Sequence, residues 1–205
     1  MQQLKLITAT LLLGLSAISH AVIIDGCVTG GDVYKANNCK FEVLITDPFE
    51  NNHGGTGVGK NNFNDGWLHS FDEVQNVWSD DYNETVSSHY VFFDPKYSKT
   101  VEGWVQFDEN IIDIIWDRNS LFNTEDQFGL DSVNYRYPRL VGLEQRDLRG
   151  TSYVDNVLYI NDWKARSPGD HIRVITQAVS IPEPGSFALL ALVLAGLAVT
   201  RLRNK

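Results

Sequence analysis

Two uncharged apolar segments, one near each end of the chain, limit the part that can fold as a domain in water. The first covers residues 6–15, follows Lys5 and precedes Ser19-His20-Ala21. A basic residue, a short apolar core and a small-x-small tripeptide together make a secretory signal peptide. We therefore expect residues 1–21 to be removed and Val22 to begin the mature chain. A first transmembrane helix is the alternative, but an apolar core of about ten residues is too short for one.

The second apolar segment, residues 187–200, lies between a Pro182-Glu183-Pro184 triplet and a basic end. It is shorter than the roughly 20 residues that span a bilayer comfortably. Tilting of the helix, and arginine side chains that reach the interface, would make up part of the difference. We predict a single C-terminal hydrophobic helix in the membrane. The basic stop that holds its end in the cytoplasm consists of Arg201, Arg203 and Lys205.

The order of triplet, apolar segment and basic end resembles the PEP-CTERM sorting signal of Gram-negative bacteria. The resemblance covers residues 181–205. It implies that a membrane protease, exosortase, recognises Pro182, Glu183 and Pro184. It also implies that the protein is anchored in the inner membrane before processing and then reaches the cell surface or the extracellular biofilm matrix. An unprocessed C-terminal anchor is the alternative.

The remaining residues, 22–180, have the length of one domain with a single hydrophobic core. The chain has 17 basic and 26 acidic residues, and four of the basic ones lie in the two end segments. Residues 22–185, the exported part, therefore carry 13 basic residues against 26 acidic ones. Nucleic acid and anionic lipid require clustered Lys and Arg, so we expect neither as a partner. Divalent cations and neutral or cationic polysaccharide remain compatible with this charge.

The chain has two cysteines, Cys27 and Cys39, in the part predicted to be exported. In an oxidising compartment such a pair is expected to form a disulfide that closes a small N-terminal loop. A metal-binding pair and a reactive thiol are the alternatives. Neither is favoured, because the spacing is not that of a Cys-x-x-Cys motif and no histidine lies between the two cysteines.

The body shows the pattern of an all-β domain. Val101, Val105 and Phe107 alternate with Glu102 and Gln106, which is typical of a strand with one buried face. Residues 110–116 form a nearly continuous apolar run, as in a central strand. Residues 139–149 give a weak helical pattern. The remaining strand candidates are residues 41–46, 73–78, 87–93, 152–160 and 171–179. Short strands separated by polar turns predict an antiparallel β-sandwich, jelly-roll-like in its connections.

Three further segments carry a second resemblance. They are residues 88–95, 142–147 and 168–174. In them the body is similar to the β-rich ectodomains that commonly precede PEP-CTERM tails. This resemblance supports the fold and implies no enzymatic activity.

The sequence offers no candidate catalytic residue, and we expect the protein not to be an enzyme. His53, His69 and His89 are spaced by 16 and 20 residues, which matches no short-spaced metal motif. No Gly-x-Ser-x-Gly sequence is present. The acid pairs Asp108-Glu109 and Glu125-Asp126 could serve a glycan-active enzyme only if two acids met across one cleft. Solvated loops explain such pairs better.

Two loops are rich in oxygen donors. One contains Asn64 and Asp65, and the other contains Asp80 and Asp81. Calcium prefers oxygen ligands from loops, so these four residues are candidates for a structural calcium site. The spacing of an EF-hand is missing. We expect no other cofactor.

Five tryptophans are many for a body of this size, and most are expected in the core because each buries a large area. Trp104 lies on the polar face of its strand and is the best candidate for an exposed platform that stacks on a sugar ring. The leading hypothesis is a non-catalytic surface or extracellular-matrix protein. A module that binds exopolysaccharide is the first alternative, and a glycan-active enzyme is the second.

Overall fold

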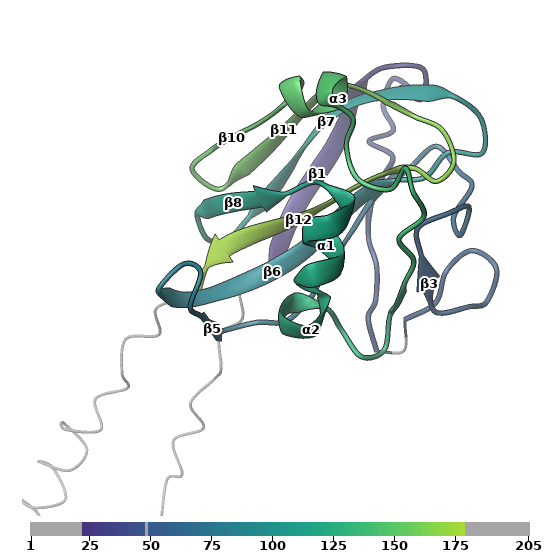
Figure 1. Cartoon of the computed structure of the whole chain (residues 1–205). Coiled ribbons are helices and arrows are strands. Elements are labelled where there is room, and N and C mark those ends of the chain that lie inside the picture. Colours follow the sequence, from purple (N-terminus) through teal and green to yellow (C-terminus); the bar gives the residue numbers. More distant parts are fainter. Residues whose placement is uncertain (1–21, 48, 179–205) are drawn as a thin grey trace, which may run out of the picture. The chain divides into compact units, whose positions relative to one another are not determined.

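The computed structural model describes residues 22–47 and 49–178, and the fold is that of these residues (Figure 1). The predicted signal peptide, residues 1–21, and the predicted C-terminal hydrophobic helix lie outside the described residues. Among the described helices, none has both the length and the apolar character needed to cross a membrane. The elements in chain order are β1 (Ile23–Gly30), β2 (Phe41–Val43), β3 (Gly57–Val58), β4 (Leu68–Asp72), β5 (Val77–Ser79), β6 (Glu84–Phe93), β7 (Lys99–Phe107), β8 (Ile111–Ile115), α1 (Arg118–Asn123), α2 (Glu125–Phe128), β9 (Asn134–Tyr135), α3 (Gln145–Arg149), β10 (Thr151–Val154), β11 (Val157–Ala165) and β12 (Asp170–Gln177).

The described strands form two larger sheets that are mainly antiparallel. The four-stranded sheet has the order β1-β7-β11-β10. The six-stranded sheet has the order β2-β4-β6-β12-β8, and β5 pairs with β6 beside this path. The pairs β2–β4 and β3–β9 are parallel. The predicted antiparallel β-rich fold is confirmed, and a jelly-roll connectivity stays a prediction.

The main hydrophobic core lies between the two larger sheets. Val101, Val105 and Phe107 of β7 are fully buried, and the alternation predicted for this strand is confirmed. They share one cluster with Val91 of β6 and Val174 of β12 from the six-stranded sheet. Burying each of these side chains contributes about 1.5–3 kcal/mol. Packing of the two sheets against each other therefore accounts for much of the stability.

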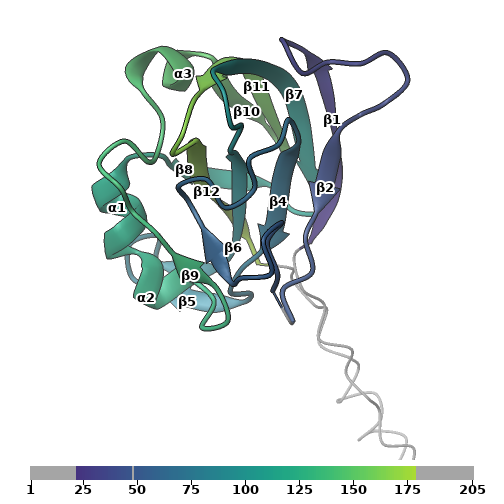
Figure 2. The same cartoon turned by 90° about the vertical axis from the view of Figure 1, so that its right-hand side faces the viewer.

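A second core covers the opposite face of the six-stranded sheet. Figure 2 shows α1 and α2 on the side of this sheet that faces away from β1 and β7. Leu121 of α1 and Phe128 of α2 pack there in one cluster with Tyr90 and Phe92 of β6. Because both faces of β6 are covered, its last eight residues are all buried.

A buried polar network joins the second core to the sheet. The guanidinium of Arg173 on β12 donates two hydrogen bonds to the carboxylate of Glu73, at 2.6 and 2.9 Å. Tyr135 and Ser88 also donate to Glu73, each at 2.6 Å. Arg173 donates further to the hydroxyl of Thr124, at 2.6 Å. Burial alone lowers the pKa of Arg173, but the negative charge of Glu73 outweighs this effect and holds the pKa above its ordinary value.

Several details differ from the sequence prediction. Residues 110–116 do form a strand, β8, but it lies at the edge of the six-stranded sheet and pairs with β12 alone among the described strands. Its run is apolar because both faces are covered: Ile111 packs in the core between the sheets and Ile115 in the second core. Residues 152–160 are not one strand but a hairpin of β10 and β11, which turns at Asp155 with φ of 52°.

Other boundaries also shift. Most of residues 73–78 connect β4 to β5 rather than forming a strand. Within residues 139–149, only α3 is helical. Strand β1 and helices α1 and α2 were not predicted. Asp117 caps α1, since its side chain accepts hydrogen bonds from the backbone N–H groups of Asn119 and Ser120, both at 3.1 Å.

Candidate functional site

The outer face of the four-stranded sheet presents Trp104, the predicted sugar platform. Trp104 is half-buried and points away from the core between the sheets. In register it pairs with Cys27 of β1 on one side and with Tyr159 of β11 on the other. Paired residues of antiparallel strands lie on the same face. The disulfide, Trp104 and Tyr159 therefore form one row across the outer face.

The next row on this face is also partly apolar. Val157 pairs with Gln106 of β7 and with Val154 of β10. Val154 is 61% exposed and Tyr159 is 41% exposed. We define the outer-face patch as Trp104, Val154, Val157 and Tyr159. Glu102 and Gln106, on the same face of β7, supply a carboxylate and an amide beside it. Aromatic rings with polar groups at their edge are suited to stacking on sugars.

Fewer tryptophans are buried than predicted, whereas Trp104, which was predicted to be exposed, is half-buried. Trp163 is fully buried, and Trp116 packs partly against the core between the sheets. Trp67 and Trp78 are 37% and 56% exposed. The indole N–H of Trp78 donates to Asp80 at 2.8 Å, which fixes the ring at the surface. Exposure alone therefore does not distinguish Trp104, and its place in a continuous patch does.

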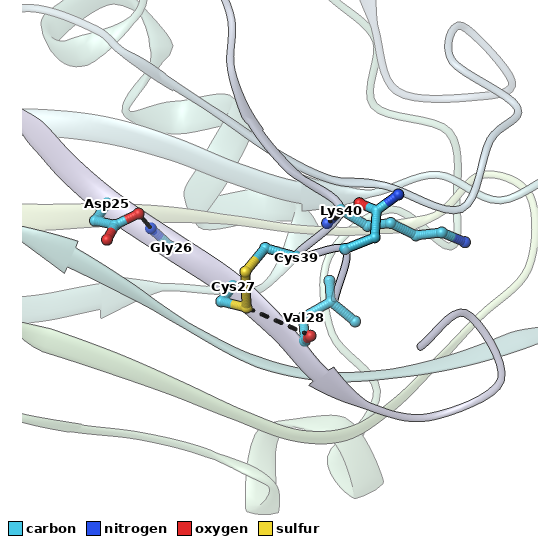
Figure 3. The surroundings of a disulfide bond; sticks show 7 residues. Asp25, Gly26, Cys27, Val28, Cys39 and Lys40 are labelled. Atoms are coloured by element: carbon cyan, nitrogen blue, oxygen red, sulfur yellow. Dashed lines mark hydrogen bonds between the residues drawn. A yellow bond between two sulfur atoms is a disulfide. The ribbon is translucent and has the colours of Figure 1, made fainter. Parts of the chain in front are cut away.

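The predicted disulfide between Cys27 and Cys39 is present (Figure 3). It joins the middle of β1 to the segment that leads into β2, with 4.5 Å between the two Cα atoms. The backbone N–H of Val28 donates to the carbonyl of Cys39 at 2.6 Å, so a hydrogen bond supports the same connection. Cys39 is exposed, and Cys27 is half-buried beside Trp104.

The four candidate calcium ligands lie in two separate places. Asp65 lies just before β4, and β4 pairs with the C-terminal end of β6. Asp80 and Asp81 lie just before the opposite, N-terminal end of β6. These ends are roughly 25 Å apart at the rise of a β-strand. The structure therefore does not bring the two pairs of residues together.

Asp65 is already engaged by protein donors. His69 lies 3.0 and 3.1 Å from its two oxygens, and Asn52 and the backbone N–H of Trp67 donate at 2.7 and 3.0 Å. Burial alone would raise the pKa of the Asp65 carboxyl, but the hydrogen bonds, chiefly that with His69, lower it. Asn64 donates to the carbonyl of Asn61 at 2.7 Å. Both residues thus hold the loop in place.

His89 lies in an arrangement that resembles a catalytic triad. Its Nδ1 is 2.7 Å from Asp72, and its Nε2 is 3.0 Å from the hydroxyl of Thr176. His89 and Thr176 are both 0% exposed, and the His89 ring contacts Phe107 in the core between the sheets. No substrate can approach the Thr176 hydroxyl in this position. The arrangement therefore links β4, β6 and β12 and has the geometry of a structural hydrogen-bond chain.

The acid pairs named from the sequence lie in surface segments. Asp108 accepts a hydrogen bond from the backbone N–H of Val22 at 2.7 Å. Glu125 and Asp126 form the first turn of α2, where negative charge favours the helix. Asp108, Glu125 and Asp126 therefore have local structural roles.

Residues 180–203 match the model of the PEP-CTERM protein-sorting motif. The chain carries a PEP-CTERM sorting signal. The matched segment contains Pro182, Glu183, Pro184, the apolar segment, Arg201 and Arg203, and it lies outside the described residues. No curated protein and no solved structure matches the chain. The PEP-CTERM motif implies an exported protein that is sorted by exosortase and is anchored in a membrane before processing.

Proposed function

We propose that this PEP-CTERM protein is a non-catalytic component of the cell surface or the extracellular matrix. The match over residues 180–203 carries the proposal. The motif begins three residues after β12 ends at Gln177, so it follows the β-rich domain directly. Exosortase reads Pro182-Glu183-Pro184 while the apolar segment holds the chain in the inner membrane. Processing then releases the β-rich domain to the outside.

The start of the domain supports export with a cleaved signal peptide. Strand β1 begins at Ile23, one residue after the expected mature N-terminus. The backbone nitrogen of Val22 lies 2.7 Å from Asp108, and the N–H of Ile23 donates to Asp72 at 3.1 Å. After cleavage, Val22 would carry a charged ammonium group beside the Asp108 carboxylate. Charge-assisted hydrogen bonds are stronger than neutral ones, so cleavage at this bond would favour the folded start of β1.

The sorting signal is tested by replacing Pro182, Glu183 and Pro184 with alanine together. We expect the variant to stay in the membrane fraction with an uncleaved C-terminus, because exosortase has lost its recognition motif. Western blotting of membrane, surface and medium fractions gives the distribution. Ser186→Ala, in the matched segment but outside the triplet, is the control and should be released like the wild type. Equal release of the triple variant would contradict the proposal.

A second candidate function is binding of neutral exopolysaccharide through the outer-face patch. It is favoured by the continuous row of Trp104 and Tyr159 with polar neighbours. The domain's acidic charge would disfavour an acidic polymer. We propose that this surface retains the processed protein in the matrix.

Trp104→Ala tests this binding function. One ring that stacks on a sugar contributes about 1–1.5 kcal/mol of binding free energy. Its loss should therefore weaken binding to the host exopolysaccharide by about tenfold. Trp78→Ala removes an exposed tryptophan outside the patch and should change nothing. Affinity electrophoresis in gels that contain the polysaccharide measures retention. Unchanged retention of Trp104→Ala, or an equal loss in Trp78→Ala, would count against the patch.

A further inference from the structure

Three carboxylates from separate places in the chain meet beside α3. Glu144 occupies the N-cap position of α3, Asp147 lies within the helix, and Asp170 is the first residue of β12. One oxygen of each carboxylate lies within 4.8 Å of an oxygen of the other two. Asp147 and Asp170 are 2% and 3% exposed, whereas Glu144 is exposed and faces solvent. We call these residues the acidic trio.

Asp170 has an unsatisfied oxygen at this position. Its Oδ2 atom is buried and has no hydrogen-bond partner. Asp147 differs, because its Oδ1 accepts a hydrogen bond from the backbone N–H of Lys164 at 3.0 Å. A buried carboxylate oxygen without a donor costs free energy unless a proton or a cation neutralises it. The Oδ2 atom of Asp170 therefore needs a proton or a cation to offset the cost of its burial.

The positive charge of Arg146 interacts with Asp147, but the main partner of Arg146 is Asp162. Among residues 22–47 and 49–178, no basic side chain forms an ion pair with any member of the trio, and Arg146 of α3 pairs instead with Asp162. Burial raises the pKa of the Asp170 carboxyl, and the charges of Asp147 and Glu144 raise it further. Burial likewise raises the pKa of Glu144, together with a hydrogen bond to Asp147. When all three acids are ionised they repel one another, and a bound cation would stabilise this ionised state.

The geometry and the donor type point to calcium. Calcium–oxygen bonds of 2.3–2.6 Å place ligands on opposite sides of the ion about 4.6–5.2 Å apart, and closer when they are adjacent. The carboxylate oxygens of the trio lie within 4.8 Å of one another, which is short enough for all three to bind one calcium ion. Oxygen donors without sulfur or imidazole suit calcium rather than zinc. We propose that Glu144, Asp147 and Asp170 bind one Ca²⁺, with water completing the coordination on the exposed side of Glu144.

Such an ion would connect α3 to the start of β12. Helix α3 packs on β10 and β11 of the four-stranded sheet, while β12 lies between β6 and β8 in the six-stranded sheet. Calcium would therefore tie the two sheets together at one end of the domain. Extracellular modules typically bind calcium with Kd of about 10⁻⁴–10⁻³ M. A site of this affinity fills outside the cell and stays empty at cytosolic concentrations.

The test is a calcium titration of the full chain, purified in detergent and stripped with EDTA. Isothermal titration calorimetry of the wild type should show one Ca²⁺ per chain with Kd of about 10⁻⁴–10⁻³ M. Asp170→Asn should abolish this binding, and Glu144→Gln should weaken it about tenfold. Asp126→Asn, which removes the same charge from an exposed acid of α2, should bind like the wild type. Calcium should raise the melting temperature of the wild type and of Asp126→Asn but not that of Asp170→Asn.

Three results would overturn the proposal. In the first, the wild type binds no calcium up to about 10 mM. In the second, Asp170→Asn binds calcium as well as the wild type does. In the third, the wild type binds Mg²⁺ more tightly than Ca²⁺. If Asp170→Asn does not fold, Glu144→Gln decides the question. The side chain of Glu144 is exposed, so weaker calcium binding by this variant would not reflect a disrupted core, whereas unchanged binding would overturn the proposal. Sorting of the chain does not enter this test, so its outcome is independent of the proposed export function.

Discussion

Replacing Arg173 with methionine should lower the free energy of unfolding by about 3–5 kcal/mol, the largest loss expected from a single substitution in the domain. Arg173 and Glu73 are both fully buried. Methionine fills much of the volume but cannot neutralise Glu73. The carboxylate would keep its hydrogen bonds from Tyr135 and Ser88 and would lose its only ion-pair partner among the described residues.

Urea unfolding at neutral pH measures this loss. The double variant Glu73→Gln with Arg173→Met should be less destabilised than Arg173→Met alone, because no buried charge remains unpaired. Arg146→Met is the matched control, since it breaks the exposed pair with Asp162 and should leave the unfolding midpoint almost unchanged. If Arg173→Met lowers the free energy of unfolding no more than Arg146→Met does, the buried ion pair does not have the proposed role.

Replacing Cys27 and Cys39 with serine together should lower the free energy of unfolding by about 2–3 kcal/mol. The cysteines are 12 positions apart, so the disulfide removes the closure entropy of a small loop from the unfolded chain. Cys39 is exposed and Cys27 half-buried, so little apolar burial is lost with the sulfurs. Most of the change should therefore come from the covalent link itself.

Reduction provides an independent control for the disulfide. Dithiothreitol should destabilise the wild type by about the same amount and should not affect the double serine variant. The same denaturant titration follows both proteins. A serine variant as stable as the oxidised wild type would show that the hydrogen bond from Val28 to Cys39 holds the loop without the disulfide.

Features that depend on neighbouring residues could be predicted from the sequence. The alternation in β7 shows directly, because every second residue lies on the core face. The disulfide follows from two cysteines in an exported chain. The sorting signal is also local, since the triplet, the apolar segment and the basic end follow one another within residues 180–205, and the motif match over residues 180–203 confirms its presence.

Features that depend on the second core could not be predicted in this way. The apolar run of β8 correctly indicates a strand with both faces covered. A strand at the edge of a sheet can also have both faces covered, so the run does not show that β8 is central in its sheet. Here Leu121 and its neighbours in α1 and α2 cover one face of an edge strand. Strand β6 shows the same effect, because helices that the sequence did not reveal bury its outer face.

The acidic trio also could not be predicted from the sequence. Glu144 and Asp147 are three residues apart, but Asp170 lies 23 positions beyond Asp147, and only the tertiary fold brings it beside them. The loops that were rich in oxygen donors, at Asn64–Asp65 and Asp80–Asp81, were more visible in the sequence. Their side chains are held partly by His69 and Trp78 instead. The number of oxygen-bearing side chains in a loop therefore did not indicate which carboxylate oxygens lack a hydrogen-bond partner in the folded domain.

We propose that the PEP-CTERM signal is processed and that the domain then leaves the cell. Intact mass and C-terminal peptide mapping of the protein from its native host, with separation of membrane, surface and medium, test this claim most directly. We expect a chain that begins at Val22, has lost everything beyond the region of Pro182-Glu183-Pro184, and is found at the surface or in the medium. An intact C-terminus at Lys205 in the membrane fraction would show an unprocessed anchor and would contradict the account.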